Sequence, residues 1–384
     1  MRGRTRIQGN SKMNIEELSV SGYRNLKKDT LNFSPGINFI YGENAQGKTN
    51  LIEAVWMFTG ARSFRGTKDI DLVNFNETSA KLEGKFFFEK RQQEISVFFS
   101  RGKRKVFLNG VSKPYPTNII GKFRVVVFSP VQLSLISGGP DGRRKFLDAA
   151  ICQLKPTYTA LLIRYNQTLK QRNALLRNMV SESNTTGFFE VWDDKLSELG
   201  AFVVKERLKY LEFLKKEAFK IYFEISGGKE NLGLNYISSF SKTISSGDSV
   251  SDIKKALKTR FEKSRQSDMK MGSTLIGPHK DELEIFIDDK RVRHFGSQGQ
   301  QRSAALSLKL AEAAVLEQEI GEPPVILLDD VMSELDDYRK SYMIDKINNR
   351  QVFITSCDFL VAERFEKGKF FKVESGKVTE VSDF

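Results

Sequence analysis

Eight consecutive residues near the start of the chain have the spacing of a phosphate-binding loop. The pattern G-x-x-x-x-G-K-[ST] is matched by Gly42, Glu43, Asn44, Ala45, Gln46, Gly47, Lys48 and Thr49. In such a loop the backbone N–H groups and the N-terminus of the following helix face the phosphates. Lys48 would reach the β- and γ-phosphates, and Thr49 would offer its hydroxyl to Mg²⁺. Together with Asn50, these residues predict a site that binds ATP with Mg²⁺.

Two acids that could complete this site stand far along the chain. Asp329 and Asp330 directly follow the apolar run Val325 to Leu328. A buried parallel strand delivers such carboxylates to the edge of the sheet where a phosphate loop also lies. Asp329 would hold Mg²⁺ through water, and Asp330 would orient or deprotonate the water that attacks ATP. The sequence therefore predicts ATP hydrolysis, with Lys48 and Asp330 as the catalytic pair.

A second helix N-terminus could also bind an anion. Residues 295–302 are rich in Gly and Gln, and the segment after them has an apolar face of helical spacing. Ser297 is predicted as the N-cap of this helix. If the phosphate loop holds the ATP of this chain, the N-terminus of this second helix is left to bind some other anion.

The surrounding patterns predict an α/β protein with a helical insertion. Strand patterns occupy residues 15–20, 36–41, 125–128, 282–287, 324–328 and 352–356, and residues 80–108 read as an antiparallel meander. Helical patterns occupy residues 49–58, 158–179, 188–223 and 253–261, whereas the Ser-rich segment 237–252 reads as a loop. We expect a head of mixed sheet, helices and meander over 13–128 and 272–384, and a mainly helical second domain over 129–271.

Composition is that of a globular protein without a membrane span. Of 384 residues, 40% are hydrophobic and 28% charged, and no apolar run approaches the roughly 18 residues that cross a bilayer. Cys152 and Cys357 fit neither a disulfide framework nor a metal motif, which favours a reducing compartment, and both are expected in the core. Residues 1–12 are expected to be a tail, either native or left from cloning.

The charge balance favours a polyanionic partner. Lys and Arg number 61 against 48 Asp and Glu, a net charge of 61 − 48 = +13. This excess fits nucleic acid, or equally a generic basic cytosolic protein. Basic residues concentrate in segments 101–105, 149–181 and 254–270. The candidate DNA contacts are Lys170, Arg172, Lys254, Lys255, Lys258 and Arg260; the alternative for each segment is a solvated charged face.

The motifs together resemble the SMC-like class of ABC ATPases, and within it the RecF family. The resemblance rests on the phosphate loop, on Ser297-Gln298-Gly299-Gln300, and on residues 327–336, and extends to segments 18–25, 128–130 and 138–148. It implies an ABC-type P-loop ATPase head and an ATP-dependent homodimer. In that dimer Ser297, Gln298, Gly299 and Gln300 of one subunit would close over the ATP of the other.

The resemblance also implies roles for further residues and partners. Ser333 to Asp336 would form the D-loop, Gln132 would sense the metal, and Arg24 would approach the nucleotide, although a surface turn residue is the alternative for Arg24. The implied partners are gapped DNA or single-stranded/duplex junctions, RecR, and indirectly RecA, in a cytoplasmic repair and recombination protein. Slow, DNA-stimulated ATP hydrolysis is the expected activity.

Spacing and departures from the pattern limit this interpretation. Thr49 and Ser297 are 297 − 49 = 248 residues apart, too few for the long coiled coil of true SMC proteins and more than transporter ATPases have. Asp330 stands where many ABC ATPases carry Glu, and no His follows the strand at 352–354. Two alternatives share the ATP site: an ABC ATPase that acts on RNA or ribosomes, and a nucleotide-dependent scaffold that barely hydrolyses ATP.

Overall fold

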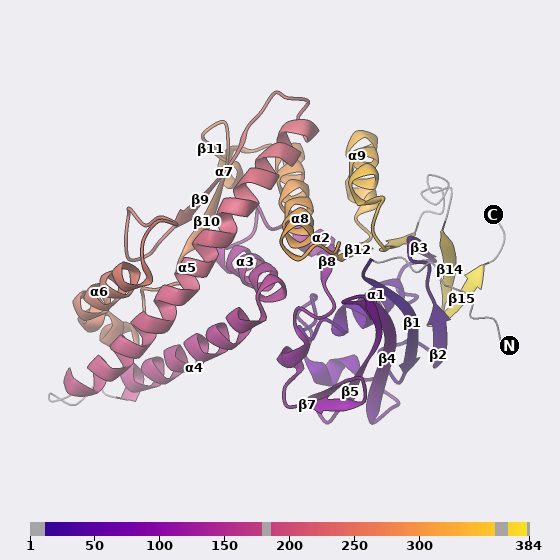
Figure 1. Cartoon of the computed structure of the whole chain (residues 1–384), viewed down its shortest axis with the longest axis horizontal. Coiled ribbons are helices and arrows are strands. Elements are labelled where there is room, and N and C mark those ends of the chain that lie inside the picture. Colours follow the sequence, from indigo (N-terminus) through magenta and orange to yellow (C-terminus); the bar gives the residue numbers. More distant parts are fainter. Residues whose placement is uncertain (1–11, 179–185, 358–367, 382–384) are drawn as a thin grey trace. The chain divides into compact units, whose positions relative to one another are not determined.

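The chain folds into two compact units. The structure, a computed structural model, describes residues 12–178, 186–357 and 368–381. One unit comprises residues 1–132 and 316–384, and the other residues 133–315 (Figure 1). Apart from Lys12, the expected tail lies outside the described residues. Within the described residues, no helix is long and apolar enough to span a membrane.

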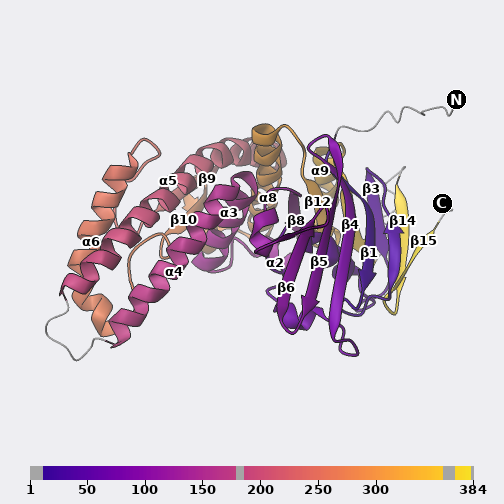
Figure 2. The same cartoon turned by 60° about the horizontal axis from the view of Figure 1, so that its bottom comes forward.

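The first unit contains an antiparallel sheet of six strands that includes the predicted meander. Across the sheet the strands are β2 (Asp29–Asn32), β1 (Asn14–Ser21), β4 (Ser79–Phe88), β5 (Arg91–Ser100), β6 (Lys103–Leu108) and β7 (Val111–Lys113). Side chains alternate between buried and exposed along β4, as a sheet with one face on the core requires. Figure 2 shows β4, β5 and β6 side by side.

A second sheet of six strands positions both halves of the predicted site. Its order is β15 (Lys377–Val381), β14 (Lys369–Glu374), β3 (Ile37–Tyr41), β13 (Val352–Ser356), β12 (Val325–Asp329) and β8 (Val125–Phe128). The five strands from β14 to β8 are parallel, and only β15 runs antiparallel. All side chains of β12 are buried, which confirms the predicted buried parallel strand.

One hydrophobic core joins the two sheets through helix α1 (Lys48–Met57). It contains Leu82 and Phe99 of the antiparallel sheet, Leu327 and Phe353 of the parallel sheet, and Leu51 of α1. The short elements of this unit are η1 (Asp69–Leu72), η2 (Pro116–Ile119), α2 (Pro130–Leu133), η3 (Met332–Glu334) and α9 (Asp337–Ile347). Because α1 begins at Lys48, inside the phosphate loop, and buries Leu51, Ile52 and Val55 in this core, the loop has a rigid base.

The second unit is mainly helical. Its elements are α3 (Pro140–Leu154), α4 (Pro156–Asn178), α5 (Thr186–Ile225), α6 (Val250–Met271), α7 (Val292–Phe295), the first part of α8 (Gln298–Ile320), and the strands β9 (Leu232–Ile237), β10 (Glu282–Ile287) and β11 (Lys290–Arg291). The three strands form a small antiparallel sheet in the order β11, β10, β9. Helix α6 is longer at both ends than the predicted segment 253–261 because Ser249 caps it and Gly272 ends it in a left-handed turn.

The boundary between the units differs from the expected one. We expected the head to resume at residue 272, whereas the chain resumes the first unit at Leu316. The reason is the pairing of β10 with β9, along with contacts of β10 to α3. The strand pattern at 282–287 therefore belongs to a small sheet within the insertion, whereas the later patterns at 324–328 and 352–356 form β12 and β13 of the first unit. The sequence could not reveal the partner strand of β10, namely β9, which directly precedes the segment predicted as a loop.

Arg172 is not a surface residue that could contact DNA, so this part of the prediction is wrong. Its side chain is fully buried in the helical unit. Arg172 Nε donates to Asp193 Oδ1 at 2.7 Å, and Nη1 donates to Asp268 Oδ2 at 2.8 Å. Both carboxylates are also buried, so the three charges form an internal ion network that joins α4, α5 and α6.

Replacing Arg172 by alanine is expected to destabilise the helical unit strongly. Removing Arg172 leaves the buried Asp268 carboxylate without the arginine that pairs with it, while Asp193 keeps only Arg265, which pairs with its Oδ2 at 2.9 Å. Breaking a buried ion pair in this way costs about 3–5 kcal/mol of unfolding free energy. Urea unfolding followed by circular dichroism measures this loss. The matched control is Lys170→Ala on the same helix, which changes an exposed side chain and should alter stability by no more than about 0.5 kcal/mol. Equal effects of the two substitutions would contradict the assigned network.

Candidate nucleotide-binding site

The residues of the predicted phosphate loop form a tight curve between β3 and α1. Gly42, Ala45 and Gly47 have positive φ values of 150°, 63° and 122°. A Cβ on Gly47 would lie 2.8 Å from Asn25 Oδ1, so only glycine fits there. Lys48 is 7% exposed, and its Nζ donates to the carbonyl oxygens of Gly42 at 2.6 Å and Glu43 at 2.8 Å. The ammonium group therefore lies inside the curve, where a phosphate would need a cation.

The two predicted half-sites meet at a direct hydrogen bond. Thr49 Oγ1 donates to Asp329 Oδ1 at 2.8 Å, although the residues are 280 positions apart. Thr355, at the end of β13, donates to the same carboxylate oxygen at 3.1 Å and accepts from the backbone N–H of Asp330 at 2.9 Å. Asp330 has φ of 54°, which turns its side chain away from the strand direction. The structure thus brings Thr49, Asp329 and Asp330 to one edge of the parallel sheet.

The carboxylates at this edge fit a hard divalent cation. Burial raises the pKa of the Asp329 carboxyl above its ordinary value of 3.8, and hydrogen bonds from Thr49 and Thr355 oppose the shift. Burial also raises the pKa of Asp330, against the opposing charge of Lys48. A cation would offset the cost of burying these charges. Among the described residues, no three His, Cys, Asp or Glu side chains cluster around a metal position. The ligands would therefore be the Thr49 hydroxyl, a carboxylate and phosphate oxygens, which suits Mg²⁺.

Arg24 is held against the loop helix and is not a free residue of a surface turn. Its Nε and Nη2 donate to Glu53 Oε2 on α1 at 3.0 and 2.8 Å, and Nη2 also donates to Thr67 Oγ1 at 3.0 Å. Ser63 donates to the other oxygen of Glu53. Glu53 is fully buried, and its contacts with Arg24 and Ser63 connect the segment after β1 and the segment after α1 to the base of the phosphate loop.

Two residues at the rim of the loop were missed from the sequence. Asn25 Nδ2 donates to the Gln46 carbonyl at 3.1 Å, and its Oδ1 accepts from Asn50 Nδ2 at 2.8 Å. Arg65 Nη1 donates to Asn50 Oδ1 at 3.0 Å, and its positive charge partly opposes the rise that burial causes in the pKa of Asp329. The only sequence signal for Asn25 was its place beside Arg24, and none pointed to Arg65. Both contact the side chain of Asn50, in the first turn of α1.

The C-terminal hairpin of β14 and β15 clamps the phosphate loop, which no pattern predicted. The backbone N–H of Gly376 donates to the Gln46 carbonyl at 3.0 Å, and that of Ser375 donates to Gln46 Oε1 at 2.6 Å. A Cβ on Gly42 would lie 2.4 Å from the Val373 carbonyl oxygen in β14. The loop is thus braced by residues more than 300 positions away in sequence, a contact that has no local pattern.

Replacing Gly376 by alanine is expected to lower both stability and nucleotide affinity. The new Cβ would lie 1.8 Å from the Asn25 carbonyl oxygen, and φ is +77°. The left-handed backbone costs about 1–2 kcal/mol for alanine, and relieving the clash costs roughly another 1–3 kcal/mol. Thermal unfolding and titration with a fluorescent ATP analogue measure the two effects.

Gly321→Ala is the matched control for Gly376→Ala. Gly321 has φ of +78°, and no atom lies within 4 Å of its ideal Cβ. This variant therefore carries the backbone cost alone, about 1–2 kcal/mol, and should leave nucleotide affinity unchanged. If the two variants bound nucleotide equally well, the hairpin would not brace the loop.

Cys357 is exposed, contrary to the expectation that both cysteines are in the core. Cys152 is buried as expected. Cys357 follows the last residue of β13, at the same sheet edge as Asp330, so it lies beyond the packed part of the strand. Its Sγ donates to Asn44 Oδ1 at 2.8 Å and accepts from Lys48 Nζ at 3.6 Å. Because β13 ends at Ser356, the Cys357 thiol lies beside the phosphate loop and contacts Asn44 and Lys48.

Three further residues with predicted roles belong to the first unit, including Gln132, which lies beyond the expected end of the head at residue 128. Gln132 lies in α2, four residues after β8, whose neighbour in the sheet is β12. Ser333 lies in η3 and donates to the Asp330 carbonyl at 2.9 Å. Asp336 caps α9 by accepting from the Arg339 N–H at 2.9 Å. Gln132 therefore lies at the carboxyl edge of the sheet, and Ser333 is joined directly to the acidic turn.

The start of α8 in the second unit has the predicted cap. Ser297 Oγ accepts from the Gln300 N–H at 3.2 Å, and Gln300 Oε1 accepts from the Ser297 N–H at 2.9 Å. This reciprocal capping box confirms Ser297 as the N-cap. Ser297 and Gln298 are exposed, and Gly299 is half-buried. The helix end is thus open to solvent and can meet an anion from another molecule.

The other basic residues proposed to contact DNA differ in solvent exposure and in ion pairing. Lys170, Lys255 and Arg260 are exposed. Lys254 and Lys258 both contact Asp194 Oδ1, at 3.3 and 3.2 Å, so one carboxylate partly neutralises two lysines. Lys170, Lys255 and Arg260 are therefore more accessible than Lys254 and Lys258.

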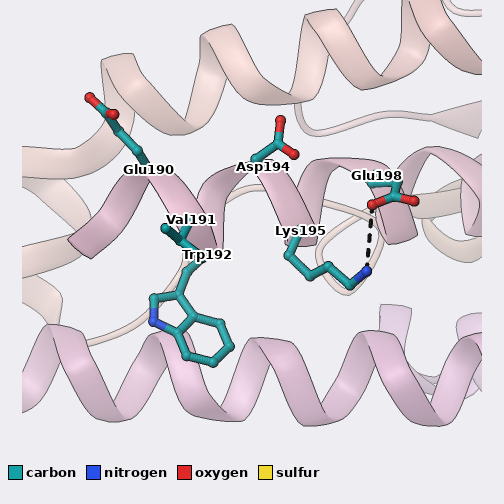
Figure 3. Close-up of a pocket in the computed structure, with 6 residues that line it drawn as sticks. All are labelled: Glu190, Val191, Trp192, Asp194, Lys195 and Glu198. Carbon is teal, nitrogen blue, oxygen red and sulfur yellow. Dashed lines mark ion pairs between the residues drawn. The ribbon is translucent and has the colours of Figure 1, made fainter. Parts of the chain in front are cut away.

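A shallow hollow in the helical unit does not belong to the predicted site. It is lined by Glu190, Val191, Trp192, Asp194, Lys195 and Glu198, all on α5, with an ion pair between Lys195 and Glu198 (Figure 3). Its lining comes from a single stretch of α5, with Glu190 and Trp192 on opposite sides of the helix, carries both charge signs, and includes no residue singled out by the sequence.

Comparison with known proteins places the chain in a family. The model of the RecF/RecN/SMC N terminal domain family matches residues 14–379. The DNA replication and repair protein RecF of Exiguobacterium sp. is 37% identical over 370 residues, which cover 95% of this chain and 99% of that protein. The RecF of Caldanaerobacter subterraneus subsp. tengcongensis is 42% identical over 347 residues, or 89% of this chain and 94% of that protein.

A solved structure agrees with these relatives over nearly the whole chain. The recombination mediator protein RecF with ATP, of the RecFOR pathway, matches with a TM-score of 0.90 and 39% identity over 98% of this chain and 100% of that one. The predicted fold class is confirmed: an ABC-type P-loop ATPase head with an inserted, mainly helical part. The chain belongs to the RecF family, within the RecF/RecN/SMC group of proteins.

Proposed function

We propose that this protein is a DNA repair and recombination ATPase that uses ATP to pair with a second copy on DNA. The observation that carries the proposal is the hydrogen bond between Thr49 and Asp329, which joins the phosphate loop to the acidic strand end. The likeness to a RecF structure with ATP supports ATP as the nucleotide.

In this proposal the residues of the loop bind and orient the triphosphate. Backbone N–H groups from Gly42 to Thr49 and the N-terminus of α1 face the phosphates, and Lys48 pairs with their outer oxygens. Thr49 and Asp329 would hold Mg²⁺, Asp329 through water, and Gln132 would sense it; the cation would supply positive charge to the phosphates. Asp330 would orient the attacking water and accept its proton. Asn50 and Arg24 complete the ATP-binding set, Arg24 by way of its pair with Glu53.

The signature helix would act on the ATP of the partner subunit. Its capped and exposed N-terminus, with Ser297, Gln298, Gly299 and Gln300, can supply N–H donors to a γ-phosphate. Ser333 and Asp336 lie in the segment after Asp330 that would face the partner as the D-loop. Two nucleotides would thus be bound between two copies, and ATP would stabilise the homodimer by mass action.

DNA is the proposed partner of the dimer. The net charge of +13 and the exposed Lys170, Lys255 and Arg260 support phosphate contacts, which give affinity without reading sequence. We infer that gapped DNA or a single-stranded/duplex junction is preferred. We further infer that RecR is a direct partner and that RecA loading is the outcome, in line with the RecFOR pathway of the related mediator protein. A cytoplasmic location belongs to the same proposal.

Phosphate release in the presence of different nucleic acids tests this function. ATP turnover should be slow alone and rise with gapped DNA, and DNA binding should weaken steeply as salt increases. Equal stimulation by structured RNA would instead favour an ATPase acting on RNA or ribosomes. Turnover that stays near zero with every nucleic acid would favour a nucleotide-dependent scaffold. Gel shifts with single-stranded, duplex and gapped DNA, each with and without ATP, give the substrate preference.

A further inference from the structure

We propose that the exposed face of α5 between Phe202 and Phe223 binds an acidic amphipathic helix of a partner protein. This face is named the α5 stripe below. It lies in the helical unit and includes no residue of the nucleotide site or of the proposed DNA contacts. The inference therefore stands or falls separately from the ATP-dependent function.

The α5 stripe exposes more aromatic surface than a solvated helix needs. Phe202, Phe213, Phe219 and Phe223 are 43%, 43%, 44% and 41% exposed. The opposite side of the same helix is already in the core, where Val204, Leu211 and Leu214 are fully or almost fully buried. A surface helix normally has one apolar side and one polar side. A second apolar side with four large rings marks a contact for another molecule.

Intramolecular packing leaves the α5 stripe uncovered. Helix α5 packs against α4, α6, β9 and α3. Its first half lies beside α4 and α6 (Figures 1 and 2). Those contacts include the buried pair of Arg172 with Asp193 and the pair of Lys254 with Asp194, both before Phe202. The second half of the helix therefore presents a continuous free face.

The spacing of the α5 stripe is that of a helix-binding seam. Lys209, Phe213, Lys216, Lys220 and Phe223 follow one another at intervals of four, three, four and three residues, and Phe202 precedes Lys209 by seven. Positions with this alternation lie in one line along a helix. At 1.5 Å per residue the line is roughly 30 Å long, enough for about six turns of a partner helix.

Charge on the α5 stripe favours an acidic partner. The exposed polar residues of α5 from 202 to 223 are Lys209, Lys216 and Lys220 against one acid, Glu212. A partner helix with apolar residues at the same three-four spacing and Glu or Asp beside them would cover the rings and pair with the lysines.

Two other occupants fit the α5 stripe less well. In a pairing of two copies of this chain, the three lysines of one α5 stripe would face the three lysines of the other, and like-charge repulsion disfavours this. A nucleic acid strand presents a phosphate about every 3.4 Å, so three lysines spread over roughly 30 Å would leave most of the phosphates along that length without a lysine. Phe219 and Phe223 also stack on each other, with centroids 6.0 Å apart and an angle of 11°, so their faces are engaged and less available to bases.

A synthetic helix provides the probe for this proposal. The peptide has about 20 residues, Leu at the three-four spacing and Glu at the flanking positions, and carries a fluorescent label. Anisotropy with the full chain should report saturable binding. A peptide of the same composition with scrambled spacing should not bind. The double variant Phe213→Ser, Phe223→Ser should weaken binding by about tenfold or more, while circular dichroism reports an unchanged fold.

Charge exchange makes the test specific to the α5 stripe. The variant Lys216→Glu, Lys220→Glu should weaken the acidic peptide by about tenfold and should bind a matched peptide with Lys in place of Glu. Ile163→Ser, which changes a 39%-exposed residue of α4, is the matched control and should bind the acidic peptide as the unchanged protein does.

Three outcomes would overturn the proposal. The first is no binding of the acidic peptide, or equal binding by the α5 and α4 variants. The second is that the α5 variants lose affinity for oligothymidine of about 20 nucleotides while the peptide does not bind, which would assign the α5 stripe to nucleic acid. The third is nucleotide-independent self-association that the α5 variants abolish, which would assign it to a second copy. ATP turnover of the variants should be unchanged, so a failure of the ATPase proposal is read separately.

Discussion

Lys48→Ala is expected to remove most of the affinity for ATP. The ammonium group lies inside the phosphate loop, 2.6 and 2.8 Å from the carbonyl oxygens of Gly42 and Glu43, and is almost fully buried. Alanine leaves the phosphates without their only lysine partner in the loop. Hydrogen bonds to charged groups contribute about 1.5–3 kcal/mol each, so the dissociation constant should rise roughly 10- to 150-fold or more. Titration with a fluorescent ATP analogue measures the change.

A control on the same unit separates this effect from general charge loss. Lys85→Ala removes a lysine whose side chain is 60% exposed in the antiparallel sheet and should leave ATP affinity unaltered. Thermal unfolding of both variants checks that the fold persists. ATP affinity of Lys48→Ala equal to that of the unchanged protein would refute the assigned phosphate loop.

Asp330→Asn should bind ATP with nearly unchanged affinity but hydrolyse it very slowly. Asparagine has the same shape and tolerates the φ of 54°, but it cannot accept a proton from water. Loss of a general base costs about 10²- to 10⁴-fold in rate. Single-turnover phosphate release measures the rate, and nucleotide titration measures the affinity. Since burial raises the pKa of Asp330, the rate of the unchanged protein should fall with decreasing pH at a pKa above 3.8.

Asp289→Asn is the matched control for Asp330→Asn. Asp289 is an exposed aspartate in the turn between β10 and β11 and has a similar φ of 65°. Its substitution should leave hydrolysis unchanged. A rate for Asp330→Asn close to that of this control would mean that another group activates the water.

The nucleotide site was predictable because its chemistry is written in local motifs. A phosphate loop such as Gly42 to Thr49 functions between a strand and a helix. The apolar residues before Asp329 are typical of a buried parallel strand. Both conditions can be seen in the sequence, and a shared sheet edge follows from them. The meeting of Thr49 with Asp329 therefore needed no knowledge of the tertiary structure.

The supporting contacts were not predictable because they join distant segments. Gly376 braces Gln46, and β9 pairs with β10, yet neither partner leaves a mark in the other's sequence. Arg172 is one basic residue among several in a basic segment. Only the fold reveals that Asp193 and Asp268 surround it. Net charge along a segment thus says nothing about which side chains are buried, and this is why the DNA contact predicted for Arg172 is wrong.

Sedimentation of Asp330→Asn with and without ATP tests the central claim most directly. If bound ATP joins two copies, the slowly hydrolysing protein should sediment as a monomer alone and as a dimer with ATP. Ser297→Asp keeps a side chain that can cap α8 but sets a negative charge against the partner's γ-phosphate, so adding it should restore the monomer. Ser249→Ala, which removes the cap of α6 in the same unit, should not prevent pairing. An unchanged monomer at saturating ATP, or a dimer that tolerates Ser297→Asp, would contradict the account.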